Sequence, residues 1–148
     1  MANDNERPRG AKATASEPPE PLNELTGKII GSAYAVHRGF GFGFLEPVYR
    51  RALAVELAFR GVGVGEEVPY ELYHRGVSVG FYRAALLAER QVIVEVKTGV
   101  VLDPVSKPQL LNYLRAADLS LGLVIHFAPT GAVIKRVVAS PEYRSRWK

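Results

Sequence analysis

Hydrophobic residues first recur along the chain at the spacing of a helix. From Asn23, which we expect to cap it, apolar positions three or four apart predict a helix over 24–38. A break rich in glycine and phenylalanine at 39–43 separates this helix from a second one, which the same spacing predicts over about 44–60. The folded part of the chain is therefore expected to open with two helices.

The apolar period then changes to two, which is typical of strands with one exposed face. A run of β-branched residues and an unbroken apolar run follow, and the unbroken run indicates a strand buried on both faces. This order of elements makes an α/β or α+β domain. The expected strands occupy 68–74, 77–87, 91–97, 121–127 and 132–138, with a third helix at 106–117.

The length of 148 residues fits one compact domain with a sizeable core. Four of the ten prolines lie within 1–22, which has no apolar period, so we expect a proline-rich extended tail there. The expected domain covers 23–139. Residues 140–148 form a second, basic and aromatic tail.

Composition excludes several classes of protein. The chain has no cysteine, which rules out disulfides, thiolate nucleophiles and zinc–thiolate sites and favours a reducing cytoplasm. No apolar run is long enough for a transmembrane helix, and the N-terminus lacks the profile of a signal peptide. We therefore expect a cytoplasmic protein, which could be peripheral on a larger complex.

The net charge of +4 is unevenly distributed. Residues 1–22 carry three basic and four acidic residues, and the remainder carries sixteen basic and eleven acidic ones. A basic body could favour phosphate backbones or anionic lipid surfaces. Because the excess is modest, we favour the simpler interpretation, a solvated surface that keeps the protein soluble.

Glu95 and Lys97 are the sharpest candidates for chemistry. They lie two residues apart at the end of an expected strand, so both side chains project to one face. A carboxylate beside an ammonium group can hold a divalent metal and a phosphate together. When the pair is taken alone, an exposed salt-bridge face is the simpler interpretation.

Glu46 and Gln109 are weaker candidates. Glu46 lies in the first turn of the second expected helix, where the helix dipole favours a carboxylate even without a function. Gln109 lies on the helix that follows the strand of Glu95, where an amide is also an ordinary surface residue.

Taken together, these segments resemble one known family, the GxxExxY proteins of the PD-(D/E)xK nuclease-like superfamily. The resemblance covers nearly all of 23–139 and implies a restriction-endonuclease-like αβββαβ core, with a mixed sheet flanked by helices. It also implies an active site in which Mg²⁺ activates a water molecule against a phosphodiester. The matching segments are Gly43-x-x-Glu46-x-x-Tyr49, Glu95-x-Lys97 and Gln109, and their four polar side chains would form that site.

Ala85 departs from the family pattern. It stands where the family carries an aspartate in its second strand. Because that carboxylate would fix the metal, we expect a vestigial site that holds no metal or other cofactor. If Mg²⁺ does bind, Glu46 and Glu95 would be its ligands.

Two further positions, Ser106 and His126, also differ from the family pattern. His126 could replace the missing ligand, but imidazole suits zinc or iron better than magnesium. A hydrogen-bonded core histidine is the commoner arrangement on an apolar strand.

Two aromatic segments could bind a partner. The segment Phe40-Gly41-Phe42-Gly43-Phe44 either caps the core or inserts Phe40 and Phe42 into another molecule. The C-terminal segment is either a frayed tail or an anchor on a protein, a nucleic acid or a membrane surface, through Arg144, Arg146 and Trp147.

Two functions remain open. The first is a catalytically inactive nuclease-fold protein that serves as a binding or structural subunit of a larger assembly and is anchored by its N-terminal tail. The alternative is a magnesium-dependent nuclease acting on DNA or RNA with a weakened or migrated site. We favour the first, because Ala85 removes a metal ligand and a proline-rich tail suits capture by a partner protein.

Overall fold

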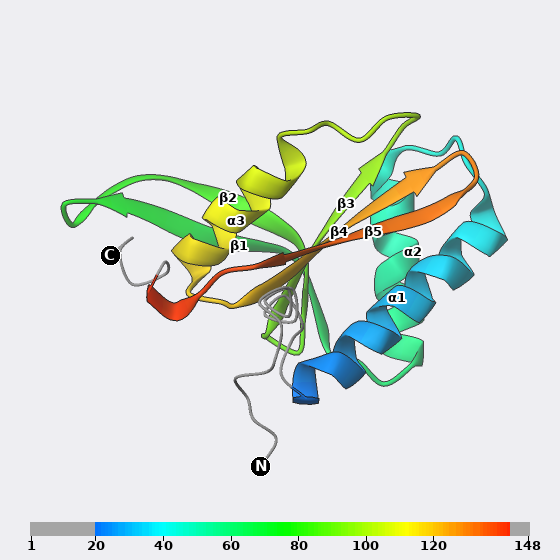
Figure 1. The fold of residues 1–148 in the computed structure, drawn as a ribbon, viewed down its shortest axis with the longest axis horizontal. Coiled ribbons are helices and arrows are strands. Elements are labelled where there is room, and N and C mark those ends of the chain that lie inside the picture. The colour runs from blue at the N-terminus through cyan, green and yellow to red at the C-terminus, as the bar shows by residue number, and fades with distance from the viewer. Residues whose placement is uncertain (1–19, 143–148) are drawn as a thin grey trace, which may run out of the picture.

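The computed structural model describes residues 20–142 and folds them into two helices, three strands, a third helix and two strands. This is the order that the sequence predicts, and every expected element is present (Figure 1). The elements are α1 (Glu20–Phe40), α2 (Glu46–Phe59), β1 (Val64–His74), β2 (Val77–Ala88), β3 (Val92–Thr98), α3 (Ser106–Ala117), β4 (Leu121–Ala128) and β5 (Gly131–Val138).

One mixed sheet of five strands forms the centre of the domain, in the order β1–β2–β3–β4–β5. Neighbouring strands are antiparallel except β3 and β4, which are parallel and are joined through α3, because a parallel pair needs a crossover connection. All eight residues of β4 are buried, which confirms that the unbroken apolar run forms a strand covered on both faces.

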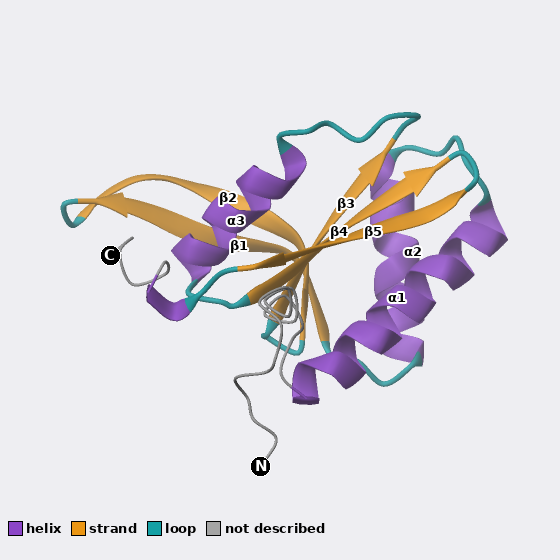
Figure 2. Ribbon diagram, in the orientation of Figure 1, coloured by secondary structure: helices purple, strands orange, loops and turns teal. Residues whose placement is uncertain are grey.

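Helices cover both faces of this sheet (Figure 2). The apolar stripes of α1 and α2 share one core with Val92, Val94 and Val96 of β3. On the other face, α3 contributes Leu110 and Leu114 to a second core. The domain therefore has one buried cluster on each side of the sheet.

The side chains of the β1–β2 hairpin change the core that they pack against partway along its length. Near its base, Leu86 and Ala88 belong to the core of α1 and α2, whereas Tyr82 and Ala84 farther out belong to the core of α3. Pairing between β2 and β3 ends at Leu86–Val94, and the outer hairpin projects away from α1 and α2 (Figure 1). Strands β2 and β3 therefore separate beyond this pair, and the candidate site lies at the point of separation.

The prediction that Asn23 caps the first helix is wrong. α1 begins at Glu20, so Asn23 lies inside the helix, where its carbonyl accepts a hydrogen bond from Oγ1 of Thr26 at 3.0 Å. Pro21 falls in the first turn, where a missing N–H has no intrahelical partner to lose, and buried Leu22 extends the apolar stripe. The helix therefore includes the last three residues of the segment that we expected to be tail.

Residues 1–19 of the predicted extended tail and the predicted anchors Arg144, Arg146 and Trp147 lie outside the described part of the chain. They stay predictions. Among the helices of residues 20–142, none has the length and apolar character needed to cross a membrane.

Candidate functional site

A cavity of about 420 Å³ opens where β2 and β3 separate. The N-terminus of α2 and parts of β1, β2 and β3 form its walls. Three of the four predicted site residues share this cavity with Ala85. The lining residues are Glu46, Glu67, Arg83, Ala85, Glu95, Val96, Lys97 and Thr98.

Ala85 lies at the centre of the site, between two strands that each present a glutamate. It comes one step beyond the last β2–β3 pair, opposite Glu95, and its N–H donates a hydrogen bond to Oε2 of Glu95 at 3.4 Å. On the other side, Glu67 of β1 lies between the pairs Glu66–Leu86 and Val68–Ala84, level with Ala85. A side chain at position 85 therefore lies between two carboxylates, and alanine brings only a methyl group there.

The carboxyl group of Glu95 has a pKa near neutrality. Burial raises the pKa of its carboxyl group to about 7, although the hydrogen bond from Ala85 and the charge of Lys97 act in the opposite direction. The charges of Glu46 and Glu67 raise this pKa further. Three glutamates thus line the cavity, and the carboxyl group of Glu95 is partly neutral at pH 7.

Glu46 is the first residue of α2 and enters the cavity from the helix N-terminus. The partial positive charge of that terminus favours a carboxylate there, and Pro47 follows in the first turn, where its missing N–H is tolerated. Burial raises the pKa of Glu46, while Arg50 and then Lys97 lower it and Glu67 raises it. The local rules for helix starts therefore explain the position of Glu46.

Arg50, one turn after Glu46, places its guanidinium among carboxylates. Its Nη1 lies 3.7 Å from Oε1 of Glu46 and 3.1 Å from Oε1 of Glu67. Its Nε lies 3.9 Å from Oε1 of Glu66. The side chain is only 17% exposed, so these ion pairs are partly shielded from solvent.

The sequence analysis missed Arg50 and Glu67. Arg50 follows Glu46 at the i, i+4 spacing of helical ion pairs, which was a usable signal. Glu67 gave no such signal, because it adopts φ of 53°, in the left-handed region that interrupts the strand alternation. That conformation costs a non-glycine residue about 1–2 kcal/mol, and it occurs where the side chains of the hairpin change the core that they pack against.

Gln109 and His126 lie elsewhere. Gln109 is exposed in the first turn of α3 and is not among the residues that line the cavity. His126 is buried in β4, and its Nε2 is 2.7 Å from the carbonyl oxygen of Gly99. This is the hydrogen-bonded core histidine that we weighed against a metal ligand.

The donor set of the cavity does not fit the magnesium that the sequence resemblance implies. Glu46, Glu67 and Glu95 offer hard oxygen atoms, which Mg²⁺ prefers. However, Arg50 already contacts Glu46 and Glu67, and Ala85 offers no ligand between Glu67 and Glu95. Nowhere in residues 20–142 do three His, Cys, Asp or Glu side chains gather closely enough to hold a metal ion.

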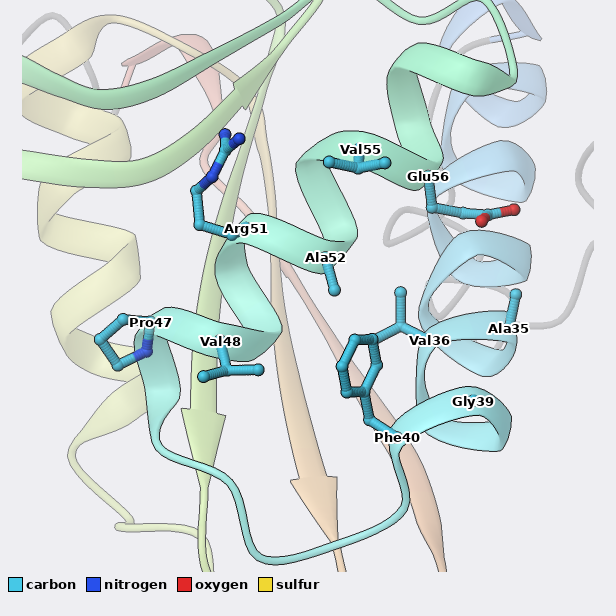
Figure 3. A pocket seen from close by; sticks show the side chains of 10 residues that line it. All are labelled: Ala35, Val36, Gly39, Phe40, Pro47, Val48, Arg51, Ala52, Val55 and Glu56. Carbon is cyan, nitrogen blue, oxygen red and sulfur yellow. The ribbon is translucent and has the colours of Figure 1, made fainter.

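A second hollow, an apolar groove of about 790 Å³, lies between α1 and α2 (Figure 3). Val48, Ala52 and Val55 of α2 line it together with Val36 and Phe40 of α1. Figure 3 shows Phe40 beside Val36 at the end of the groove where α1 stops. Val55 is 59% exposed, so this apolar surface is open to solvent.

The glycine- and phenylalanine-rich loop between these helices is attached to the core through aromatic rings. Phe40 meets Phe44 edge to face at 5.6 Å between ring centroids, Phe44 meets Tyr49 at 6.3 Å, and Tyr49 stacks on buried Phe127 at 4.5 Å. Phe40 and Phe42 nevertheless remain 45% and 42% exposed. The loop therefore combines a cap on the core with exposed rings.

Comparison with known proteins gives one family. The family model described as the PD-(D/E)XK nuclease superfamily matches residues 23–137. No curated protein matches the chain. A crystal structure of SSO0001 is 18% identical, with a TM-score of 0.49, over 68% of this chain and 54% of that one, so the chain spans about half of that protein's length.

Proposed function

The chain belongs to the PD-(D/E)XK nuclease superfamily, and from this premise we propose that it is a catalytically inactive member that serves as a binding or structural subunit of a larger assembly. Its five-stranded mixed sheet with three helices is the restriction-endonuclease-like fold of that superfamily. Within the superfamily we assign it to the GxxExxY proteins, on Gly43, Glu46 and Tyr49.

The observation that carries this proposal is the methyl group of Ala85 at the centre of the cavity. A ligand at this position would lie between Glu67 and Glu95. Magnesium binds through one or two carboxylates in strict octahedral geometry, so the loss of a central ligand weakens any site here. Because about 1.4 kcal/mol of barrier is a tenfold change in rate, a misplaced metal would cost most of the activity. Glu46, Glu95 and Lys97 are then vestiges of an active site, whereas the fourth expected member, Gln109, lies outside the cavity.

The groove between α1 and α2 supports a role in binding. Val48, Ala52, Val55 and Phe59 follow one another along α2 at spacings of four, three and four residues, the spacing with which one helix packs against another. Phe59 is 85% exposed, and Val55 is 59% exposed. Exposed apolar surface of this kind marks interaction sites, and the occupant that we propose is an apolar-faced helix of a partner protein.

The partner would also hold the ends of the chain. We propose that the proline-rich N-terminal segment and the C-terminal Arg144, Arg146 and Trp147 contact the same assembly, in the cytoplasm or on a complex at a membrane surface. Pro-rich segments lose less entropy on capture, and arginine and tryptophan are frequent interface anchors.

Co-purification tests this function. Tagged full-length protein is expressed in its native cells, and its partner is identified by mass spectrometry. We expect removal of residues 1–19, which leaves α1 whole, to abolish the complex without changing the melting temperature of the domain. We expect Val55→Glu to weaken the same complex, and Val79→Glu, on the exposed outer hairpin, to leave it intact. A complex that survives both the deletion and Val55→Glu would refute the subunit proposal.

The alternative, a magnesium-dependent nuclease on DNA or RNA with a migrated site, is favoured by one observation. Glu67 brings a carboxylate into the cavity beside Ala85, where the expected aspartate is missing. Incubation of the protein with supercoiled plasmid or labelled RNA, in Mg²⁺ or Mn²⁺, decides between the two functions. We expect no cleavage above background, and cleavage by wild type that Glu95→Ala abolishes would establish the nuclease.

A further inference from the structure

We propose that Arg50, which lies beside the β2–β3 cavity, takes the place of a metal ion there: its guanidinium bridges the lining residues Glu46 and Glu67, balances their charge and keeps a divalent metal out. The inference rests on the proposed loss of metal-dependent catalysis. It explains how the cavity retains its carboxylates without a metal.

The contacts of Arg50 carry the proposal. One nitrogen, Nη1, approaches both Glu46 at 3.7 Å and Glu67 at 3.1 Å. These two carboxylates come from different elements, the start of α2 and the middle of β1, and both line the cavity. The guanidinium therefore ties α2 to β1 at the wall of the cavity, although Arg50 is not itself among the lining residues.

The bridge is buried at its arginine end, whereas the side chains of Glu46 and Glu67 are 36% and 46% exposed. Only 17% of the Arg50 side chain is exposed, and its buried Nε has no hydrogen-bond partner. Exposed pairs are screened by water and salt, whereas charges in a partly buried site interact more strongly. The contacts of this guanidinium are therefore ion pairs with Glu46, Glu66 and Glu67.

A guanidinium and a divalent ion cannot share these ligands. A metal ion would need oxygen atoms at about 2.0–2.6 Å, and Arg50 already meets two of the three cavity carboxylates with a positive charge. Without Arg50, three glutamates would line the cavity with only Lys97 and Arg83 as lining cations to offset them. These carboxylates do not converge on one point while Arg50 holds two of them, so loss of the bridge would free Glu46 and Glu67 to close around a cation. Glu67, beside Ala85, would then replace the missing aspartate.

The neighbouring Arg51 provides a matched control. It is 60% exposed and forms its ion pair with Glu66, which is not a lining residue of the cavity. The two arginines are adjacent on the same helix, so replacement of either removes the same side chain and the same charge. Only Arg50 contacts Glu46 and Glu67 among the ion pairs of the described residues.

Manganese titration of the full chain tests the inference, with the electron paramagnetic resonance of free Mn²⁺ as the readout. We expect wild type and Arg51→Met to show no saturable binding below about 1 mM, and Arg50→Met to bind one ion at least about tenfold more tightly. Addition of Glu67→Gln to Arg50→Met should abolish that binding. No gain of binding in folded Arg50→Met, or a gain that persists without Glu67, would overturn the proposal.

A second measurement covers the case in which Arg50→Met does not fold. We then compare the thermal melts of Glu67→Gln and Glu24→Gln with that of wild type. Glu24 is the control, because it is exposed on α1 and forms no ion pair with another described residue. The bridge predicts that Glu67→Gln lowers the melting temperature more than Glu24→Gln does, because only Glu67 loses a contact with the guanidinium of Arg50. An equal or smaller effect of Glu67→Gln would refute the bridge.

Failure of this inference is distinguishable from failure of the proposed function. Cleavage by wild type refutes the function, whatever the arginine variants do. The titration instead compares variants with wild type in metal binding alone. A folded Arg50→Met that binds no metal refutes the bridge and leaves an inactive wild type as it was.

Discussion

The backbone N–H of Ala85 donates a hydrogen bond to Oε2 of Glu95, so the residue that fails to supply a carboxylate still positions one. The bond is long, at 3.4 Å, and burial raises the pKa of Glu95 to about 7 in spite of it. The cavity therefore holds a carboxyl group that prefers to be neutral, beside Lys97 and two further glutamates. This has a consequence for stability as a function of pH.

We expect Glu95 to make the folded state less stable as the pH rises. Its folded-state pKa of about 7 lies above the ordinary value of 4.5, so its contribution is full below about pH 4.5 and is lost as the pH rises through 7. The change is at most about 3 kcal/mol. Urea unfolding of wild type and Glu95→Gln at pH 5 and pH 8 measures it: wild type should lose stability relative to Glu95→Gln. Parallel pH profiles would contradict the assigned pKa.

Gly122 on β4 allows α3 to approach the sheet closely. A Cβ atom at this position would lie 2.9–3.0 Å from the side-chain carbons of Leu110, which is fully buried. We expect Gly122→Ala to destabilise the domain by about 1–3 kcal/mol, because the overpacked core must shift. Gly131→Ala, at the start of β5, is the control, since nothing lies within 4 Å of its added Cβ. Equal effects of the two substitutions in urea unfolding would refute the close contact.

The turn between β2 and β3 is strained at two residues. Glu89 and Arg90 both lie in the left-handed region, with φ of 50° and 59°, and Glu89 also accepts a hydrogen bond from the N–H of Gly63 at 2.6 Å. We expect Arg90→Gly to stabilise the domain by about 1 kcal/mol, because glycine adopts this conformation without a steric cost. Glu89→Gly should gain less, since it loses the bond to Gly63. Thermal melts of both variants decide, and a destabilised Arg90→Gly would contradict the strain.

Local and periodic signals predicted most of the fold. Apolar spacing placed all eight elements, and the β-branched run of β3 and the unbroken run of β4 were recognisable because burial on both faces leaves no polar alternation. The helix start was misplaced, because Asn23 is a good cap by residue type while Leu22 belongs to the buried stripe. Tertiary packing therefore decided where α1 begins.

The candidate site was only partly predictable, for a different reason. Glu46, Glu95 and Lys97 carry spacing signals within one helix or one strand, and the cavity unites them. Glu67 enters the cavity through pairing of β1 with β2 and through its own left-handed backbone, and neither leaves a mark in the residue pattern. Long-range register thus supplied the part of the site that sequence reasoning could not.

Tyr49 joins the loop of 41–44 to the core, and its hydroxyl group should be essential to that connection. The ring is fully buried and stacks on Phe127, while the hydroxyl donates to the carbonyl of Gly41 at 2.6 Å and accepts a hydrogen bond from the N–H of Phe44 at 3.3 Å. Tyr49→Phe keeps the ring and its packing but leaves both backbone groups without this partner. The loop, rather than the whole domain, should therefore respond most strongly.

We expect Tyr49→Phe to lower the free energy of unfolding by about 1–2 kcal/mol, which is the usual cost of leaving a buried polar group unsatisfied. Amide hydrogen exchange should also accelerate at 41–44 more than in β4, because the loop loses two of its attachments while the strand keeps its ladder. Tyr34→Phe is the matched control, since Tyr34 is 46% exposed on α1. Unchanged exchange at 41–44 in Tyr49→Phe would show that ring stacking alone holds the loop. In that case the exposed Phe40 would depend on its contact with Phe44, and Phe44→Ala rather than Tyr49→Phe would release it.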